Sequence, residues 1–151
     1  MTDNPTDRPS GPADSATERD AYFAQDAAGT PEKEGRFIEV DDLRSVSFTP
    51  GLDFRPILGD RVMANFVYFD EHTEAPTHVH DEEQVTVVLE GELEFDLGEE
   101  RRVLRPGQAA VIPPWVRHGA RTRSTRCVEI DIFAPPRAVL VRKLLEDEDQ
   151  R

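Results

Sequence analysis

Between residues 36 and 133 the sequence is a succession of short segments, either alternating in hydropathy or wholly apolar, separated by Gly, Pro and Asp. Alternation with a period of two is typical of strands that bury one face. Short strands at such regular spacing predict an antiparallel sandwich or barrel, so we expect an all-β fold. The expected strands are residues 37–39, 46–48, 53–58, 62–69, 77–80, 84–90, 92–97, 101–104, 109–112, 119–122 and 126–133.

The clearest of these strands is residues 92–97, which read ELEFDL. Leu93, Phe95 and Leu97 share one face of such a strand, and three acidic residues share the other. We therefore expect one face of this strand to pack in the core and the other to meet water.

The two ends of the chain differ from this central part. Residues 1–35 are rich in Pro, Asp, Thr, Ser, Ala and Gly, and such a composition cannot bury enough surface to offset the entropy of ordering. We expect a disordered acidic tail there, with a short helix around residues 16–28, acting as a solvated leader rather than a docking peptide. Residues 36–137 would form the β-domain, and residues 138–151 a short C-terminal helix that runs into a charged tail.

Composition argues against several classes of function. The net charge of −13 repels phosphate, so nucleic acid is not an expected partner. The apolar runs are far shorter than the roughly 20 residues of a membrane-spanning helix, so no membrane partner is expected. Cys127 is the only cysteine, and residues 1–35 lack the apolar stretch of a secretory signal. A cytoplasmic location is therefore expected.

The histidines suggest a metal site. His78 and His80 fall on one face of a strand, and Gln84 has the same parity. A neutral imidazole at His118, which follows a double-proline turn, would complete a set of nitrogen and oxygen donors suited to a divalent transition metal. These donors suit Zn, Ni, Fe, Mn or Co alike. The alternative is that these histidines are half-buried or solvated residues without a ligand.

The last expected strand carries an unusual polar face. Glu129, Asp131 and Phe133 share one side of residues 126–133, a combination that is odd for packing. Lining a polar cavity, Asp131 could move a proton and Arg137 could hold a substrate carboxylate as a bidentate fork. The alternative is a structural ion pair between Asp131 and Arg137 that closes the barrel.

Two motifs resemble those of the cupin family. The pattern His78-x-His80-x3-Gln84-x6-Gly91 resembles the first cupin motif, and Pro106-Gly107 followed by His118 resembles the second. This resemblance implies a double-stranded β-helix, or jelly-roll barrel, over about residues 37–137. The family usually has Glu where this chain has Gln84, and a neutral amide would leave a bound metal more positive. That departure weakens an assignment as an oxygen-using dioxygenase.

The sequence also resembles one cupin subgroup. His-His-Gln-His sites are a feature of KdgF-type cupins, which help convert 4,5-unsaturated uronates to linear ketone forms. Residues 131–137, DIFAPPR, resemble the Asp-x-Phe-x-Pro-Pro-Arg block of that subgroup. The resemblance implies that Asp131 and Arg137 are catalytic and that Phe133 lines the substrate pocket. One divalent metal would be held by His78, His80, Gln84 and His118.

The leading hypothesis is thus a metal-dependent cupin enzyme that tautomerises or opens an unsaturated, uronate-like carboxylate without redox change. The alternatives are a cupin-type aromatic polyketide cyclase and a non-catalytic metabolite-binding cupin. The expected partners are a small anionic substrate and a second copy of the chain, since cupin barrels commonly pair through an edge strand.

Three further features allow two interpretations each. Trp115 either caps the substrate pocket or packs as a loop aromatic. His72 is expected at the rim of the site, although it could add a ligand. The basic residues near His118 either attract an anionic substrate or balance nearby acids on a solvated face. They are Arg117, Arg121, Arg123 and Arg126.

Overall fold

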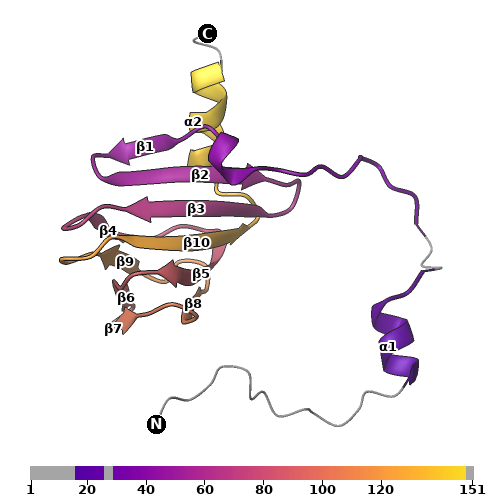
Figure 1. Ribbon diagram of the computed structural model, residues 1–151, viewed down its shortest axis with the longest axis horizontal. Helices are drawn as coiled ribbons and strands as arrows, with labels where there is room; N and C mark the ends of the chain where they lie inside the picture. Colours follow the sequence, from indigo (N-terminus) through magenta and orange to yellow (C-terminus); the bar gives the residue numbers. More distant parts are fainter. Residues whose placement is uncertain (1–15, 26–28, 149–151) are drawn as a thin grey trace. The chain divides into compact units, whose positions relative to one another are not determined.

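The computed structural model describes residues 16–25 and 29–148 (Figure 1). Strands dominate this described part, and the expected all-β class is confirmed. The strands are β1 (Val46–Thr49), β2 (Leu52–Leu58), β3 (Met63–Phe69), β4 (Glu74–His78), β5 (Glu83–Glu90), β6 (Leu93–Leu97), β7 (Glu100–Leu104), β8 (Ala109–Ile112), β9 (His118–Arg121) and β10 (Cys127–Ala134). The helices are α1 (Ala16–Tyr22), the 3-10 turn η1 (Val40–Asp42) and α2 (Ala138–Glu148).

The strands form two antiparallel sheets. The larger sheet has the order β1-β2-β3-β10-β5-β8, and the smaller has the order β4-β9-β6-β7. The last strand of the chain, β10, lies between β3 and β5 in the larger sheet, as Figure 1 shows. Apolar side chains of both sheets form one buried cluster, which includes Val67, Val88, Leu93 and Ile112. The core therefore lies between the sheets.

All the expected strands except residues 37–39 overlap an observed one. Residues 37–39 have no strand structure, and the side chain of Phe37 is fully exposed, so this prediction is wrong. Strand β1 pairs with β2 at that edge of the sheet, and the chain before it makes the turn η1 instead. Strand β4 ends at His78, so His80 lies in the following loop and not on the strand face.

Strand β6 has the two faces expected from its alternation. Leu93 and Phe95 are buried, whereas Glu94 and Asp96 form ion pairs with arginines of the neighbouring strands. The hydrogen bonds and charges of Arg101 and Arg121 lower the pKa of Asp96 to about 2. Arg123 also pairs with Glu94, and Arg126 pairs with Asp70. For Arg121, Arg123 and Arg126, these pairs match the interpretation of the basic run as a face that balances nearby acids.

The contacts within the chain divide it into residues 1–37 and residues 38–151. In the first unit, α1 ends at Tyr22, earlier than the helix expected around residues 16–28, of which 26–28 lie outside the described residues. The rings of Tyr22 and Phe23 meet edge to face, with centroids 4.7 Å apart, and both remain exposed. Among the described residues no helix is both long and apolar enough to cross a membrane.

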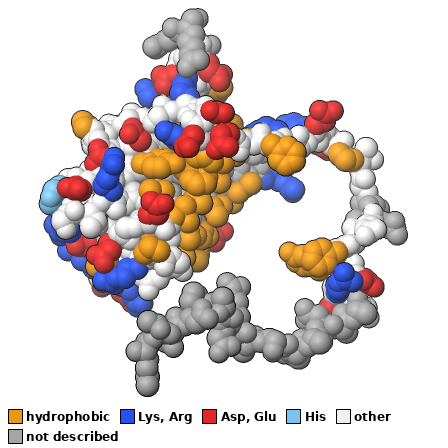
Figure 2. All heavy atoms as spheres, viewed as in Figure 1, with side chains coloured by type: hydrophobic (Ala, Val, Ile, Leu, Met, Phe, Trp, Pro, Cys, Tyr) orange, Lys and Arg blue, Asp and Glu red, His pale blue; other side chains and the backbone are white. Residues whose placement is uncertain are grey.

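Several apolar side chains of the larger sheet face outward. Ile132 on β10, Leu89 on β5 and Val111 on β8 are 37%, 40% and 56% exposed. Figure 2 shows hydrophobic side chains gathered on the displayed face of the molecule, with acidic and basic side chains around them. The β-domain therefore carries apolar surface outside its core.

Gly91, in the turn from β5 to β6, provides a test of this fold. Its φ is +76°, and a Cβ there would lie 1.9 Å from the carbonyl oxygen of Arg126. Gly98 has a similar φ of +59°, but a Cβ built there meets no other described residue within 4 Å beyond its chain neighbours. We expect Gly98→Ala to lose about 1–2 kcal/mol of unfolding free energy through backbone strain alone. Gly91→Ala should lose a further ~1–3 kcal/mol through the clash.

Urea unfolding followed by circular dichroism would measure both losses. Equal losses for the two variants would show that the turn does not approach Arg126 as described.

Candidate metal centre and adjoining cavity

The histidine cluster forms where the last residue of β4 lies close to the first residues of β9 and β5. His78 is the last residue of β4 and pairs in register with His118, the first residue of β9. His80 follows β4 by two residues, and Gln84 lies near the start of β5. The structure therefore brings together the four residues that the sequence suggested as metal ligands, although His80 arrives from a loop.

Three side-chain atoms converge in this cluster. The Nε2 atoms of His80 and His118 are 3.1 Å apart. The Oε1 atom of Gln84 lies 3.1 Å from Nε2 of His80 and 3.2 Å from Nε2 of His118. His78 contributes a further nitrogen, and one ligand atom from each histidine lies within 4.8 Å of the others. His80, Gln84 and His118 are buried, whereas His78 is exposed.

Backbone carbonyl groups determine which nitrogen of each imidazole carries the proton. The Nδ1 atoms of His78, His80 and His118 lie 2.7, 2.9 and 2.8 Å from the carbonyl oxygens of Pro76, Glu82 and Val116. A carbonyl oxygen can only accept, so each Nδ1 donates, and Nε2 of the neutral ring keeps its lone pair. Burial lowers the pKa of His118 to about 4, and burial together with the charge of Arg137 lowers the pKa of His80. Both rings are therefore neutral near pH 7.

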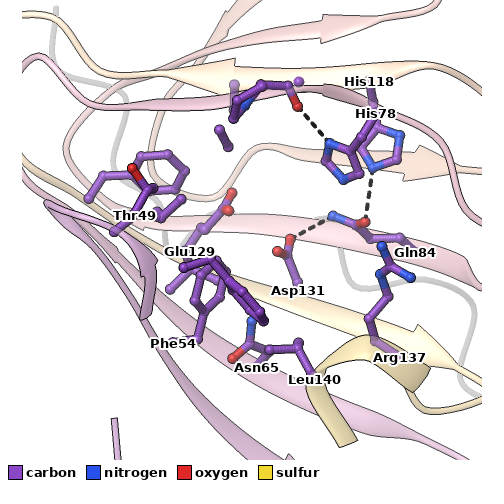
Figure 3. A pocket seen from close by; sticks show the side chains of 18 of the residues that line it. Thr49, Phe54, Asn65, His78, Gln84, His118, Glu129, Asp131, Arg137 and Leu140 are labelled. Atoms are coloured by element: carbon purple, nitrogen blue, oxygen red, sulfur yellow. Dashed lines mark hydrogen bonds between the residues drawn. The ribbon is translucent and has the colours of Figure 1, made fainter. Parts of the chain in front are cut away.

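The amide of Gln84 is oriented by two neighbours. Its Nε2 donates to Oγ1 of Thr86 at 2.9 Å and to Oδ1 of Asp131 at 2.8 Å. The hydroxyl of Thr86 in turn donates to the same Oδ1 at 2.6 Å. Both amide hydrogens thus point toward Thr86 and Asp131. The oxygen Oε1 points the other way, toward the histidines, as Figure 3 shows for His118 and Gln84.

Nε2 of His80, Nε2 of His118 and Oε1 of Gln84 therefore face one another, and each of these atoms can only accept a hydrogen bond. A cation would turn this mutual repulsion into attraction. Nitrogen and oxygen donors at bond lengths of about 2.1 Å from one ion lie roughly 3 to 3.4 Å apart, which agrees with the observed separations. The backbone carbonyls on Nδ1 also orient the rings as outer-shell partners do in metal sites. The donor set thus fits a divalent transition metal.

A cavity of about 480 Å³ adjoins the cluster. His78, Gln84 and His118 line it together with Asp131, Phe133 and Arg137. Much of the remaining wall is apolar, formed by residues such as Phe54, Val67, Phe95 and Leu140. A concave apolar site with a few convergent polar groups is typical of a small-molecule pocket.

Strand β10 places its polar face toward this cavity. Glu129, Asp131 and Phe133 are 3%, 7% and 5% exposed, whereas Ile132 points outward. Burial raises the pKa of Asp131 to about 6, despite the hydrogen bonds from Thr86 and Gln84. Burial, together with the charge of Asp131, raises the pKa of Glu129 well above its ordinary value. The cavity wall therefore carries carboxyl groups that hold protons more readily than usual.

Arg137 reaches the cavity from the residue before α2. Within the described part of the chain its ion-pair partner is Glu82, at 3.3 Å, and not Asp131 as the structural alternative supposed. The other oxygen of Glu82 accepts from the backbone N–H of Ala138 at 2.9 Å. Burial would raise the pKa of Glu82, but these two donors keep it below its ordinary value. Glu82 thus anchors both Arg137 and the start of α2.

Two residues considered from the sequence lie elsewhere. Trp115 is 63% exposed, has a φ of +67°, and is not part of the cavity wall. His72 lies in the turn between β3 and β4, outside the cluster.

Conversely, Thr86, Glu82 and Asn65 belong to the site although the sequence did not single them out. Inward parity with Gln84 could have indicated Thr86, whereas Glu82 and Asn65 gave no comparable signal.

Comparison with known proteins agrees with this fold. Residues 65–133 match the model of the cupin domain family. KdgF from a Halomonas species is 29% identical, with 71% of this chain and 99% of that chain covered and a TM-score of 0.67. An RmlC-like cupin from Shewanella frigidimarina is 28% identical, with 71% and 96% covered and a TM-score of 0.66.

A third similar structure, the polyketide cyclase RemF from Streptomyces resistomycificus, is 21% identical, with 70% and 82% of the chains covered and a TM-score of 0.62. This likeness shows the shared fold alone. Residues 65–133 thus resemble a cupin domain, and the two antiparallel sheets agree with the jelly-roll architecture expected from the motifs. Among the cupins it resembles KdgF.

The arrangement of ring protons can be tested directly. In protein stripped of metal by a chelator, we expect long-range proton–nitrogen NMR spectra at pH 7.5 to show His80 and His118 protonated at Nδ1 and bare at Nε2. His72, which is exposed and lies outside the cluster, serves as the internal control, assigned with His72→Asn. A proton on Nε2 of His80 or His118 would mean that the two rings share a hydrogen bond and that no cation is needed.

Proposed function

We propose that the protein is a metal-dependent cupin enzyme that catalyses the non-redox tautomerisation or ring opening of an unsaturated, uronate-like carboxylate. The observation that carries this proposal is the convergence of three lone-pair atoms at one wall of a cavity that Asp131 and Arg137 also line. The resemblance of residues 131–137 to the KdgF block and the 29% identity to KdgF itself support the uronate class.

His78, His80, Gln84 and His118 would hold one divalent ion, which when bound supplies a Lewis acid that polarises a substrate oxygen. Arg137 would bind the substrate carboxylate. Its guanidinium has five N–H donors, and the bond to Glu82 leaves a fork available for bidentate contact. Because Glu82 also accepts from the N-terminus of α2, this guanidinium is held at the cavity wall before substrate arrives.

Asp131 would move the proton. Both hydrogen bonds that it accepts from Gln84 and Thr86 end on Oδ1, so Oδ2 is the atom for exchange with substrate. In an enol-to-ketone conversion one proton leaves the enol oxygen and one is added to the neighbouring carbon. The atoms and electrons balance without an oxidant or reductant. Much of the cavity wall around this exchange is apolar.

A turnover assay tests the proposed function. Protein dialysed against a chelator would be mixed with a 4,5-unsaturated monouronate, and loss of the absorbance of its conjugated double bond would be followed. We expect acceleration on addition of at least one of Zn, Ni, Fe, Mn or Co. Failure of all five would contradict the proposal and favour a metabolite-binding cupin or a polyketide cyclase.

Asp131→Asn separates catalysis from structure. The Asn carbonyl can still accept from Gln84 and Thr86, so the fold and the ligand orientation should survive. Turnover should fall by roughly 10²- to 10⁴-fold, the usual scale of general acid–base catalysis. Asp53→Asn, on the exposed face of β2, is the matched control and should retain full turnover. A well-folded Asp131→Asn protein with wild-type turnover would refute the role of Asp131.

We also propose a homodimer formed through β8. This strand is at the edge of the larger sheet, and Val111 on it is 56% exposed. Light scattering should give twice the chain mass of 17.0 kDa, and Val111→Lys should shift the protein toward monomer. Val103→Lys, on the edge strand of the smaller sheet, should leave the dimer intact. A monomeric wild-type protein would contradict this proposal.

A further inference from the structure

Two polar side chains in the cavity wall have buried atoms without partners. Within the described part of the chain, Nδ2 and Oδ1 of Asn65 and Oε2 of Glu129 are buried and have no hydrogen-bond partner. Asn65 is 0% exposed and Glu129 is 3% exposed. Leaving such groups unpaired costs about 1–3 kcal/mol each, so a side chain without a task at these positions would destabilise the fold.

Both side chains belong to the inner face of the larger sheet. Asn65 on β3 lies directly opposite Asp131 on β10, and Glu129 is two residues along β10 on the same face. Both line the same cavity as Arg137, His78 and His118. In Figure 3, Glu129 and Asn65 lie on the far side of Asp131 from the histidine rings.

We propose that Asn65 and Glu129 form a subsite that binds hydroxyl groups of the ligand. The ligand class is then a polyhydroxylated ring carboxylate, with its acid group on Arg137 and its hydroxyls at this subsite. The inference rests on the proposed function for the carboxylate-binding role of Arg137.

The chemistry of the subsite favours neutral hydroxyls over other groups. The Asn65 amide offers one donor and one acceptor side by side, which matches a hydroxyl that both accepts and donates. Burial and the neighbouring Asp131 favour the protonated form of Glu129, so its carboxyl can also donate. A second anionic group on the ligand would meet two acidic side chains here, and a purely apolar group would leave the amide unpaired.

Binding of two related probes tests the subsite without relying on turnover. D-Glucuronate carries a ring carboxylate and hydroxyls, whereas tetrahydropyran-2-carboxylate has the same ring and carboxylate but no hydroxyls. Titration calorimetry on wild-type protein should show D-glucuronate binding at least about 10-fold tighter. Asn65→Leu should weaken D-glucuronate by about 10- to 100-fold and leave tetrahydropyran-2-carboxylate unchanged.

Glu129 provides a conservative and a disruptive variant. Glu129→Gln keeps a donor and an acceptor and should stay within about 3-fold of wild type for D-glucuronate. Glu129→Met keeps the volume but removes both, and should weaken D-glucuronate by about 10- to 100-fold. Thermal unfolding of each variant controls for folding, and we expect no loss of stability for Asn65→Leu, since an apolar residue replaces an unpaired amide.

The outcomes separate the subsite from the proposed function. Equal weakening of both probes by Asn65→Leu, or wild-type preference of less than about 3-fold, would overturn the subsite. If the Asn65→Leu variant turned over the unsaturated monouronate at the wild-type rate, the subsite would also be overturned, while the proposed function would stand. The predicted probe preference in a protein without turnover would support the subsite while the proposed function fails.

Discussion

The site depends on the hydrogen bonds that hold the amide of Gln84. Asp131 and Thr86 take up both of its hydrogens, so its oxygen faces the two buried imidazoles. Backbone carbonyls hold the protons of those imidazoles on the opposite side of each ring. Because every donor points away, only acceptors remain at the centre. The same Asp131 that fixes this arrangement also lines the cavity, so its carboxyl group would couple the orientation of the Gln84 amide to the proposed proton transfer.

Strand β10 explains how a small all-β domain makes room for such a site. A strand between two others usually buries its apolar face, but β10 turns Glu129 and Asp131 inward and leaves Ile132 partly exposed. The flanking strands add Asn65 on one side and Thr86 on the other, in register with Asp131. Fully paired, such a polar row would be structural. Within the described part of the chain, atoms of Asn65 and Glu129 in this row lack hydrogen-bond partners, which is typical of a surface that a ligand completes.

Local periodicity was enough to predict much of this. Alternation in β6 and the polar face of β10 follow from a period of two, which holds wherever a strand continues. The same rule failed at His80, because β4 ends at His78 and the loop, not the pleat, brings the second imidazole to the cluster. The ion pair between Glu82 and Arg137 depends on where α2 begins relative to β5. A short sequence motif does not predict that relative position. Asn65 looks like an ordinary inward position in the sequence, and only the structure shows that its buried amide has no hydrogen-bond partner among the described residues.

The central claim is that the converging lone pairs of His80, His118 and Gln84 bind one cation. Equilibrium dialysis of the full chain against Zn, Mn and Ni, followed by elemental analysis, measures this most directly. The account predicts one ion per chain for at least one of these metals in the wild type and in His72→Asn, with at least about a 10-fold loss of affinity in His118→Ala. No bound ion with any of the metals, or equal binding by His118→Ala, would contradict it.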